Sequence, residues 1–307
     1  MSSSYATETP QVSARFLNQS FLNAIEGGRT KEAADEGTNF IREIVRQASA
    51  VREILPPVGL QDDEIDRDER TDEPKKIVEK EPQSVATFVE FQGTPSAYWF
   101  RGPRYAVYFG KIMSPKATKS KFQLMTYQND IRKILADNFV KDMADQEDKA
   151  WRRMSLTVVD KNAGAQRTRA PSFTSAAFKR AFQALLDRRR PIGKVLMTKS
   201  LFMEAIDLPA TLVGNGIAEA HYKEGIENEE KLWGIPVVTT VKSDIYDPRE
   251  AWVYSPQNFL GNFFMLQDST LFLKSEADMI EFYTYEAPGI GIGNRLSIQH
   301  LAFPARD

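Results

Sequence analysis

The sequence predicts an α+β protein in which helices and strands occupy separate stretches of the chain. Three observations carry this prediction. Apolar residues recur at helical spacing in residues 12–55 and again in residues 129–154. From Val85 the apolar period changes to two, which is typical of strands, and residues 276–287 return to a long alternating pattern. With 307 residues the chain is long enough for one large or two ordinary domains.

Composition excludes several classes of function. The formal net charge of -2 argues against an extensive basic surface, and therefore against nucleic-acid binding as the main task. Because there is no cysteine, disulfides, thiolate zinc sites and cysteine nucleophiles are excluded, which suits a reducing cytoplasm. The N-terminus lacks the pattern of a secretory signal, and no stretch approaches the ~18 apolar residues of a membrane span. We therefore expect synthesis in the cytoplasm and no membrane partner.

Two helical patterns fill residues 12–55, separated by Gly27-Gly28 and Gly37. The second pattern ends at Pro56-Pro57, because proline disfavours helix in the residue before it. The following segment, residues 61–81, holds ten acidic and five basic side chains and almost nothing to bury. This composition predicts an extended, solvated arm, and it lacks the spaced ligands and central glycine of a calcium-binding loop.

A β excursion follows this arm. Its predicted strands are marked by Val85, Thr87, Val89 and Phe91, then by Tyr105, Val107 and Phe109, and then by Phe122 and Leu124. No helix in the neighbouring sequence covers these strands, and a lone hairpin is only marginally stable in water. We therefore expect the excursion to lie against another subunit.

The rest of the chain alternates helices and strands. The longest predicted helix covers residues 130–153 with Asn129 as its cap, and a short strand is predicted at residues 156–159. A second helix is predicted at residues 175–189 and a helical turn at 200–206. Further strands are predicted at residues 194–197, 232–241, 251–254 and 263–273, before the long alternating strand and a final strand within residues 295–303.

The glycine-rich stretch "APGIGIGNR", residues 287–295, superficially resembles a phosphate-binding loop. The dinucleotide fingerprint needs a third glycine where Asn294 stands, and a helix afterwards where a strand pattern follows. We interpret Gly289, Gly291 and Gly293 as positions where a strand bends or changes sheet, and we expect no cofactor.

Other candidate chemistry is equally sparse. His221 and His300, the two histidines, lie in no recognisable motif, and each is interpreted as an ordinary surface or core residue. The basic residues 188–190 end a helix, where the helix dipole favours cations. Residues 98–101, "YWFR", form an aromatic loop tip, which favours a protein contact over base stacking because no basic groove surrounds it. We therefore expect neither a metal site nor an enzyme.

The order of these elements resembles the major capsid proteins of tailed bacteriophages, which have the Hong Kong 97-like fold. The stretches that carry the resemblance are "RRPIGKVLMTKSLFMEAI" (189–206), "EKLWGIPVVTT" (230–240), "AWVYSPQNFLG" (251–261) and the closing sequence from "EADMIEFYTYEA" to "RLSIQHLAF" (276–303). The resemblance covers roughly Phe40 to the C-terminus.

The resemblance implies a division of the chain into an arm, a loop and two domains. The N-terminal arm is expected at residues 1–80 and the extended β loop at 81–127. The peripheral domain, with its spine helix, is expected at 128–170 and 274–290, and the axial α/β domain at 171–273 and 291–307. Gly289, Gly291 and Gly293 are then expected where the last long strand crosses from the peripheral to the axial domain.

The implied function is self-assembly into hexamers and pentamers of an icosahedral shell around double-stranded DNA, which is contacted without sequence specificity. Inter-subunit contacts are expected at the loop residues Trp99, Phe100, Arg101, Tyr105 and Phe109. The implied partners are further copies of the chain, a separate scaffolding protein, a portal and a decoration protein, and the implied location is the virion.

Three alternatives remain open at this stage. An encapsulin has the same fold but encloses a protein cargo, and the long, charged N-terminal region favours the virus over it. An α/β enzyme would require a deep pocket with convergent carboxylates or His221 inside it. A nucleic-acid-binding protein would show steeply salt-dependent binding to free DNA.

Overall fold

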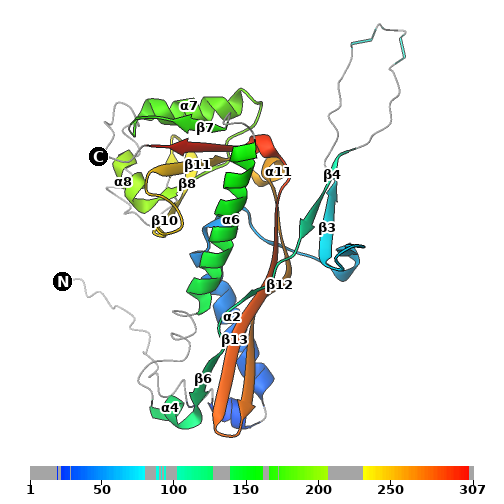
Figure 1. The fold of residues 1–307 in the computed structure, drawn as a ribbon, viewed down its shortest axis with the longest axis vertical. Helices are drawn as coiled ribbons and strands as arrows, with labels where there is room; N and C mark the ends of the chain where they lie inside the picture. Colours follow the sequence, from blue (N-terminus) through cyan, green and yellow to red (C-terminus); the bar gives the residue numbers. More distant parts are fainter. Residues whose placement is uncertain are drawn as a thin grey trace, which may run out of the picture. The chain divides into compact units, whose positions relative to one another are not determined.

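A computed structural model describes residues 19, 22–27, 29–79, 88–89, 91, 93–94, 102–126, 139–161, 166–171, 173–206 and 231–303 (Figure 1). The chain divides into two compact units. Unit 1 consists of Met1–Glu53, Lys111–Trp151 and Gln267–Ala287, and unit 2 of Ile54–Gly110, Arg152–Leu266 and Pro288–Asp307. Each unit therefore combines segments that are far apart in the sequence.

Unit 1 is built on a long β hairpin. The hairpin strands are β12 (Gly261–Glu276) and β13 (Met279–Ile292), drawn in orange in Figure 1, and both continue into unit 2. β13 also pairs antiparallel with β5 (Ile112–Met113) and β6 (Ala117–Ser120). Side chains along β13 alternate, because successive residues of a strand point to opposite faces. Ile280, Phe282, Thr284 and Glu286 are buried, whereas the residues between them are partly exposed.

Helix α2 (Thr30–Ala48) packs against the buried face of this hairpin. The apolar core of unit 1 consists of Leu22, Ile25, Ile41, Val45, Phe139, Val140, Leu271, Ile280 and Phe282. Thr38 Oγ1 accepts a hydrogen bond of 2.9 Å from the Leu271 amide, which fixes the helix to β12. The predicted break at Gly37 is wrong, since α2 is continuous there. Packing of one helix face outweighs the modest cost of a glycine within a helix.

A buried ionic cluster joins the short helix α3 (Ala50–Ile54) to the hairpin and to α6 (Lys141–Lys161). Arg52 has a side chain only 2% exposed, and its Nη2 lies 2.8 Å from Glu147 and 2.9 Å from Glu286, both completely buried. Nη1 lies 3.4 Å from Asp268 on β12. Glu286 Oε2 also accepts a hydrogen bond of 2.7 Å from the Ser269 hydroxyl. Four segments of unit 1 thus meet at one cation.

Unit 2 contains a six-stranded sheet in the order β7-β14-β11-β8-β10-β9. The strands are β7 (Arg167–Arg169), β8 (Lys194–Thr198), β9 (Lys231–Leu232), β10 (Ile235–Thr240), β11 (Glu250–Tyr254) and β14 (Ile298–Ala302). β11 is the central antiparallel strand, flanked by β8 and β14, and all five of its residues are buried. The strands predicted for the last third of the chain are confirmed, although 207–230 lies outside the described residues.

Two helices cover this sheet. Helix α7 (Ser175–Leu186) packs on β7 and β14, and α8 (Lys199–Ile206) packs on β8 and β10 (Figure 1). Thr174 caps α7, because its hydroxyl accepts a hydrogen bond from the Ala177 amide. Phe178, Phe182 and Trp233 form edge-on ring contacts within the apolar core beneath α7.

One buried acid lies among these strands. Glu250 accepts a hydrogen bond of 2.9 Å from Arg152 and lies 3.1 Å from His300, whose ring stacks on Trp252 at 4.1 Å. Burial alone would raise the pKa of Glu250, but the hydrogen bonds with His300 and Arg152 lower this pKa to about 2. The carboxylate therefore stays ionised and bound at neutral pH.

The acidic segment is folded, which corrects the prediction of an extended, solvated arm. It forms a three-stranded antiparallel sheet of β2 (Asp66–Arg67), β3 (Pro74–Glu79) and β4 (Arg104–Tyr108), preceded by β1 (Val58–Gly59) and a single turn at Asp62–Glu64. The charges become compatible with a fold because they pair locally: Lys76 lies 3.1 Å from Glu64 and Lys75 lies 3.5 Å from Asp68.

Two further predictions of local structure are wrong. Phe122 and Leu124 lie in helix α4 (Lys121–Thr126), which begins where Ser120 and Gln123 bond each other's backbone amides; the adjacent strand is β6. Residues 156–159 continue α6 to Lys161, because Trp151, Ser155 and Val159 recur every fourth residue and are fully buried. The predicted start of that long helix, 130–138, lies outside the described residues. No helix in the described part of the chain is long and apolar enough to cross a membrane.

The Arg52 cluster makes the stability of the protein depend on pH. Burial, and then the negative charge of Glu147, raise the pKa of Glu286 to about 8, although Arg52 opposes this shift. The folded state therefore keeps a proton that the unfolded state has released above pH 4.5. The free energy of unfolding should fall as pH rises from 4.5 to about 8, by up to about 1.4 kcal/mol per pH unit.

Urea unfolding at a series of pH values, for the unaltered protein and for Glu286→Gln, measures this effect. Glutamine preserves the shape of the side chain and cannot ionise, so the stability of the variant should depend less on pH across this window. Parallel pH profiles for the two proteins would contradict the role assigned to Glu286.

Candidate functional site

Three glycines near the end of β13 lie directly under three side chains of the loop strand β4 and its end. A Cβ atom on Gly289 would lie 2.7 Å from the ring of Phe109, and one on Gly291 would lie 2.4 Å from Val107 Cγ2. A Cβ atom on Gly293 would lie 2.7 Å from the Tyr105 hydroxyl. Such separations are too short for real atoms, so each glycine leaves the space that one β4 side chain fills.

This glycine track, defined as Gly289, Gly291 and Gly293, is matched residue by residue. Every second residue of one segment faces every second residue of the other: Gly289 faces Phe109, and two residues further on Gly291 faces Val107. The two segments therefore run in opposite directions. The Gly110 amide donates a hydrogen bond of 3.0 Å to the Pro288 carbonyl at the start of the contact. In the sequence, the three glycines and the three loop residues each recur at every second position. Only the tertiary structure shows that the two sets contact each other.

Two of the predicted inter-subunit residues make contacts with their own chain. Tyr105 and Phe109 are partly buried, and both pack on the glycine track. Trp99, Phe100 and Arg101 lie outside the described residues, as does His221. A role of the five loop residues in contacts between subunits therefore remains a prediction, and the structure adds an intrachain role for Tyr105, Val107 and Phe109.

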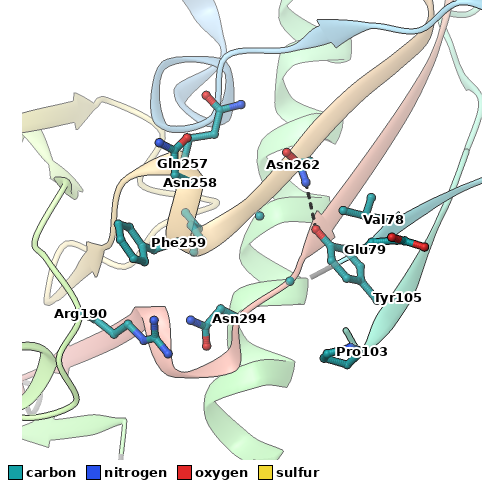
Figure 2. Close-up of a pocket in the computed structure, with 13 residues that line it drawn as sticks. Val78, Glu79, Pro103, Tyr105, Arg190, Gln257, Asn258, Phe259, Asn262 and Asn294 are labelled. Atoms are coloured by element: carbon teal, nitrogen blue, oxygen red, sulfur yellow. Dashed lines mark hydrogen bonds between the residues drawn. The ribbon is translucent and has the colours of Figure 1, made fainter. Parts of the chain in front are cut away.

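A cavity of about 850 Å³ adjoins the glycine track (Figure 2). Its lining is rich in side-chain amides: Gln257 and Asn258 come from α11 (Gln257–Leu260), Asn262 from β12, and Asn294 from the residues after β13. Asn262 donates a hydrogen bond of 3.0 Å to the Tyr105 hydroxyl, as Figure 2 shows. Burial raises the pKa of Tyr105 against the effect of this hydrogen bond, so the phenol stays protonated at neutral pH.

The cavity carries little chemistry for catalysis. Its charged lining residues are Glu79 and Arg190, and Glu79 is exposed and pairs with Arg104. His300 lies in the core of unit 2, where it contacts Glu250 and Trp252 and does not line this cavity. Within the described ranges, no group of acidic and histidine side chains is arranged to hold a metal ion. A nucleophile with a neighbouring base is therefore not assembled at this cavity.

The glycine track predicts a steric effect of substitution. Gly291→Val should lower the free energy of unfolding by about 1–3 kcal/mol, because the added methyl groups overlap Val107 and force β4 away from β13. Urea unfolding monitored by tryptophan fluorescence measures the change. Gly59→Ala is the matched control, since its added Cβ meets no atom within 4 Å and its stability should change little. Equal effects of the two substitutions would contradict close packing at Gly291.

No family model matches the sequence, and no curated protein matches it. Solved structures do match. A chain from mycobacterium phage Bobi is 12% identical, with a TM-score of 0.58 over 84% of this chain and 91% of that chain. The mature capsid of bacteriophage PhiM1 is 8% identical, with a TM-score of 0.54 over 84% and 88%. A virus-like particle from Pyrococcus furiosus is 13% identical, with a TM-score of 0.52 over 88% and 99%.

These identities are low, and the likeness concerns the fold. It extends over most of this chain and most of each matched chain. The predicted α+β capsid fold, of the Hong Kong 97 type, is therefore confirmed.

Proposed function

We propose that this protein is the major capsid protein of a tailed bacteriophage and that its function is structural. Copies of the chain assemble as hexamers and pentamers into an icosahedral shell around double-stranded DNA. The observation that carries this proposal is the fold, shared over 84% of the chain with the mature capsid of phage PhiM1. A catalytic centre is not part of the proposal, because the described cavity assembles none of the groups that a reaction requires.

The exposed side chains of the loop support assembly. Phe88 and Phe91 are completely exposed in the single chain, although phenylalanine is among the residue types that folded proteins usually bury. Exposed aromatic clusters mark contacts with other proteins. In the proposal, residues 81–127 lie across a neighbouring subunit, and Trp99, Phe100, Arg101, Tyr105 and Phe109 contribute to that contact.

The domain assignment belongs to the same proposal. Residues 1–80 form the arm, 128–170 and 274–290 the peripheral domain, and 171–273 and 291–307 the axial domain. Support comes from β13, which passes from unit 1 to unit 2 between Ala287 and Pro288, just before the glycine track. α2 lies within the compact core of unit 1, so this part of the proposed arm also stabilises its own chain.

The proposed partners are a separate scaffolding protein, a portal and a decoration protein, with the DNA contacted without sequence specificity. The proposed location is the virion, after assembly in the host cytoplasm. An encapsulin-type nanocompartment is the second candidate, because the virus-like particle from Pyrococcus furiosus shares the fold. The contents of isolated shells distinguish the two: nuclease-protected double-stranded DNA supports the virus, and a protein cargo supports the nanocompartment.

Negative-stain electron microscopy with light scattering tests assembly directly. The purified protein, alone and with candidate scaffolding proteins, should form closed shells or rings of five and six subunits. A compact monomer or dimer under all of these conditions would overturn the proposal.

Replacing the exposed loop aromatics should separate assembly from folding. Phe88→Ser with Phe91→Ser removes apolar surface that the described part of the chain leaves exposed, so shell yield should fall by at least about tenfold while the unfolding midpoint stays nearly unchanged. Sedimentation of shells and urea unfolding measure the two effects. Leu186→Ser, at an exposed position on α7 outside the proposed loop, is the control and should retain shells. Normal shell yield from the double variant would contradict a role for this loop.

A further inference from the structure

The outer face of the unit 1 hairpin carries an aromatic row that the described part of the chain leaves partly exposed. On β12 and β13, the ring of Phe272 lies 5.0 Å from that of Tyr283, which lies 6.4 Å from that of Tyr285. Phe272 is 45% exposed, and Met113, opposite Tyr285 on β5, is 49% exposed. The opposite face of the same strands is the buried core of unit 1. An aromatic row on the exposed side is typical of a contact surface.

Two lysines are held over this row. Lys111 Nζ lies 4.7 Å from the centre of the Tyr285 ring, and Lys116 Nζ lies 5.4 Å from the centre of the Tyr283 ring. Contacts of this kind attract the ammonium group to the ring face and restrict the side chain. Residues 111–121 contain four lysines and no acidic residue, and Lys116 Nζ also lies 3.2 Å from Glu281 on the same face of β13. We call Lys111, Lys116, Tyr283, Tyr285 and Phe272 the lysine–tyrosine face.

The complementary charge lies on unit 2, in the turn between β2 and β3. Residues 61–73 contain eight acidic and two basic side chains. One of the acids, Asp68, organises the turn: its carboxylate accepts hydrogen bonds of 2.9 Å from the Arg70 amide and from the Tyr108 hydroxyl. These bonds lower the pKa of Asp68, which therefore remains ionised. Asp66, the first residue of β2, and Glu69, in the turn itself, are both exposed.

An ordered acidic turn is a suitable occupant for a lysine–tyrosine face. Its backbone is fixed before binding, so less conformational entropy is lost on contact. Opposite charges steer the two surfaces together and select the correct register. Because the two surfaces lie on different parts of the chain, a contact between them is head-to-tail, and such contacts form rings when the rotation between successive copies closes.

We propose that the lysine–tyrosine face of one copy binds the acidic β2–β3 turn of a neighbouring copy. The inference rests on the proposed shell function and adds a second contact to the one proposed for the loop aromatics. Lys111 and Lys116 pair with Asp66 and Glu69 of the neighbour, and the exposed rings pack against the turn. Long lysine side chains maintain these pairs when the angle between neighbouring subunits changes, as it does between pentamers and hexamers.

Charge reversal tests the pairing. Lys111→Glu with Lys116→Glu should lower shell yield by at least about tenfold, and Asp66→Lys with Glu69→Lys should do the same, because like charges then meet. A chain with all four substitutions should recover most of the yield. Lys179→Glu with Lys199→Glu, at exposed lysines of α7 and α8, is the control for the change in net charge and should assemble normally. Urea unfolding of every variant checks that the monomer remains folded.

Cross-linking tests the contact without relying on yield. Since the chain has no cysteine, Lys116→Cys and Glu69→Cys each introduce a single thiol. Shells assembled from a mixture of the two variants should give linked dimers with a short bis-maleimide, whereas a mixture of Lys179→Cys with Glu69→Cys should not.

The outcomes separate this inference from the proposed function. Shells that form without the 116–69 link, or a fourfold variant that is no better than either double variant, overturn the contact and leave shell formation intact. Normal shells from Lys111→Glu with Lys116→Glu that fail only to bind a separate protein also overturn it, because the face then serves another partner. Failure of the unaltered protein to form shells under any condition overturns the proposed function itself.

Discussion

The fold of unit 1 depends on one buried cation. Arg52 is closed off from water together with Glu147 and Glu286, which lie 95 and 234 residues away along the chain. Removal of one partner from such a group leaves an uncompensated charge in the interior, which typically costs about 3–5 kcal/mol. Unit 1 is therefore complete only when the early helices, the middle helix and the late hairpin are all present. The segment that is proposed to reach a neighbouring subunit is in this way also bound into its own subunit.

In unit 2, close packing depends on positions that have no side chain. The glycine track lets Phe109, Val107 and Tyr105 approach β13 closely, which fixes the base of the loop strands to the end of the long hairpin strand. Glycine in a strand weakens it, and close approach of another segment is the usual compensation. The base of the loop is thereby fixed on the scaffold, as a segment that presents contact residues requires.

The Arg52 cluster and the glycine track are compatible with a protein in which some residues stabilise the single chain and others contact neighbouring copies. The buried cluster and the glycine track stabilise the single chain, whereas Phe88, Phe91 and the lysine–tyrosine face leave apolar and charged surface exposed. Interfaces of permanent assemblies bury about 2,000–5,000 Å² or more and are more apolar than ordinary surface. In the proposed shell, the subunits are held together by surfaces that contribute little to the folding of each monomer.

The sequence by itself determined the α+β class, the strands β11 to β14 and helix α7, because these follow from local apolar patterns, and the order of these elements carried the resemblance to the capsid fold. It did not determine the structure of the acidic segment, where composition favours solvation but Lys75 pairs with Asp68 and Lys76 pairs with Glu64. It placed a strand where Trp151, Ser155 and Val159 continue α6, because β-branched residues favour strands until packing on one face outweighs that preference. The Arg52 cluster and the contact between β4 and the glycine track were decided by tertiary structure alone, since both join residues far apart in the chain and carry no local signal.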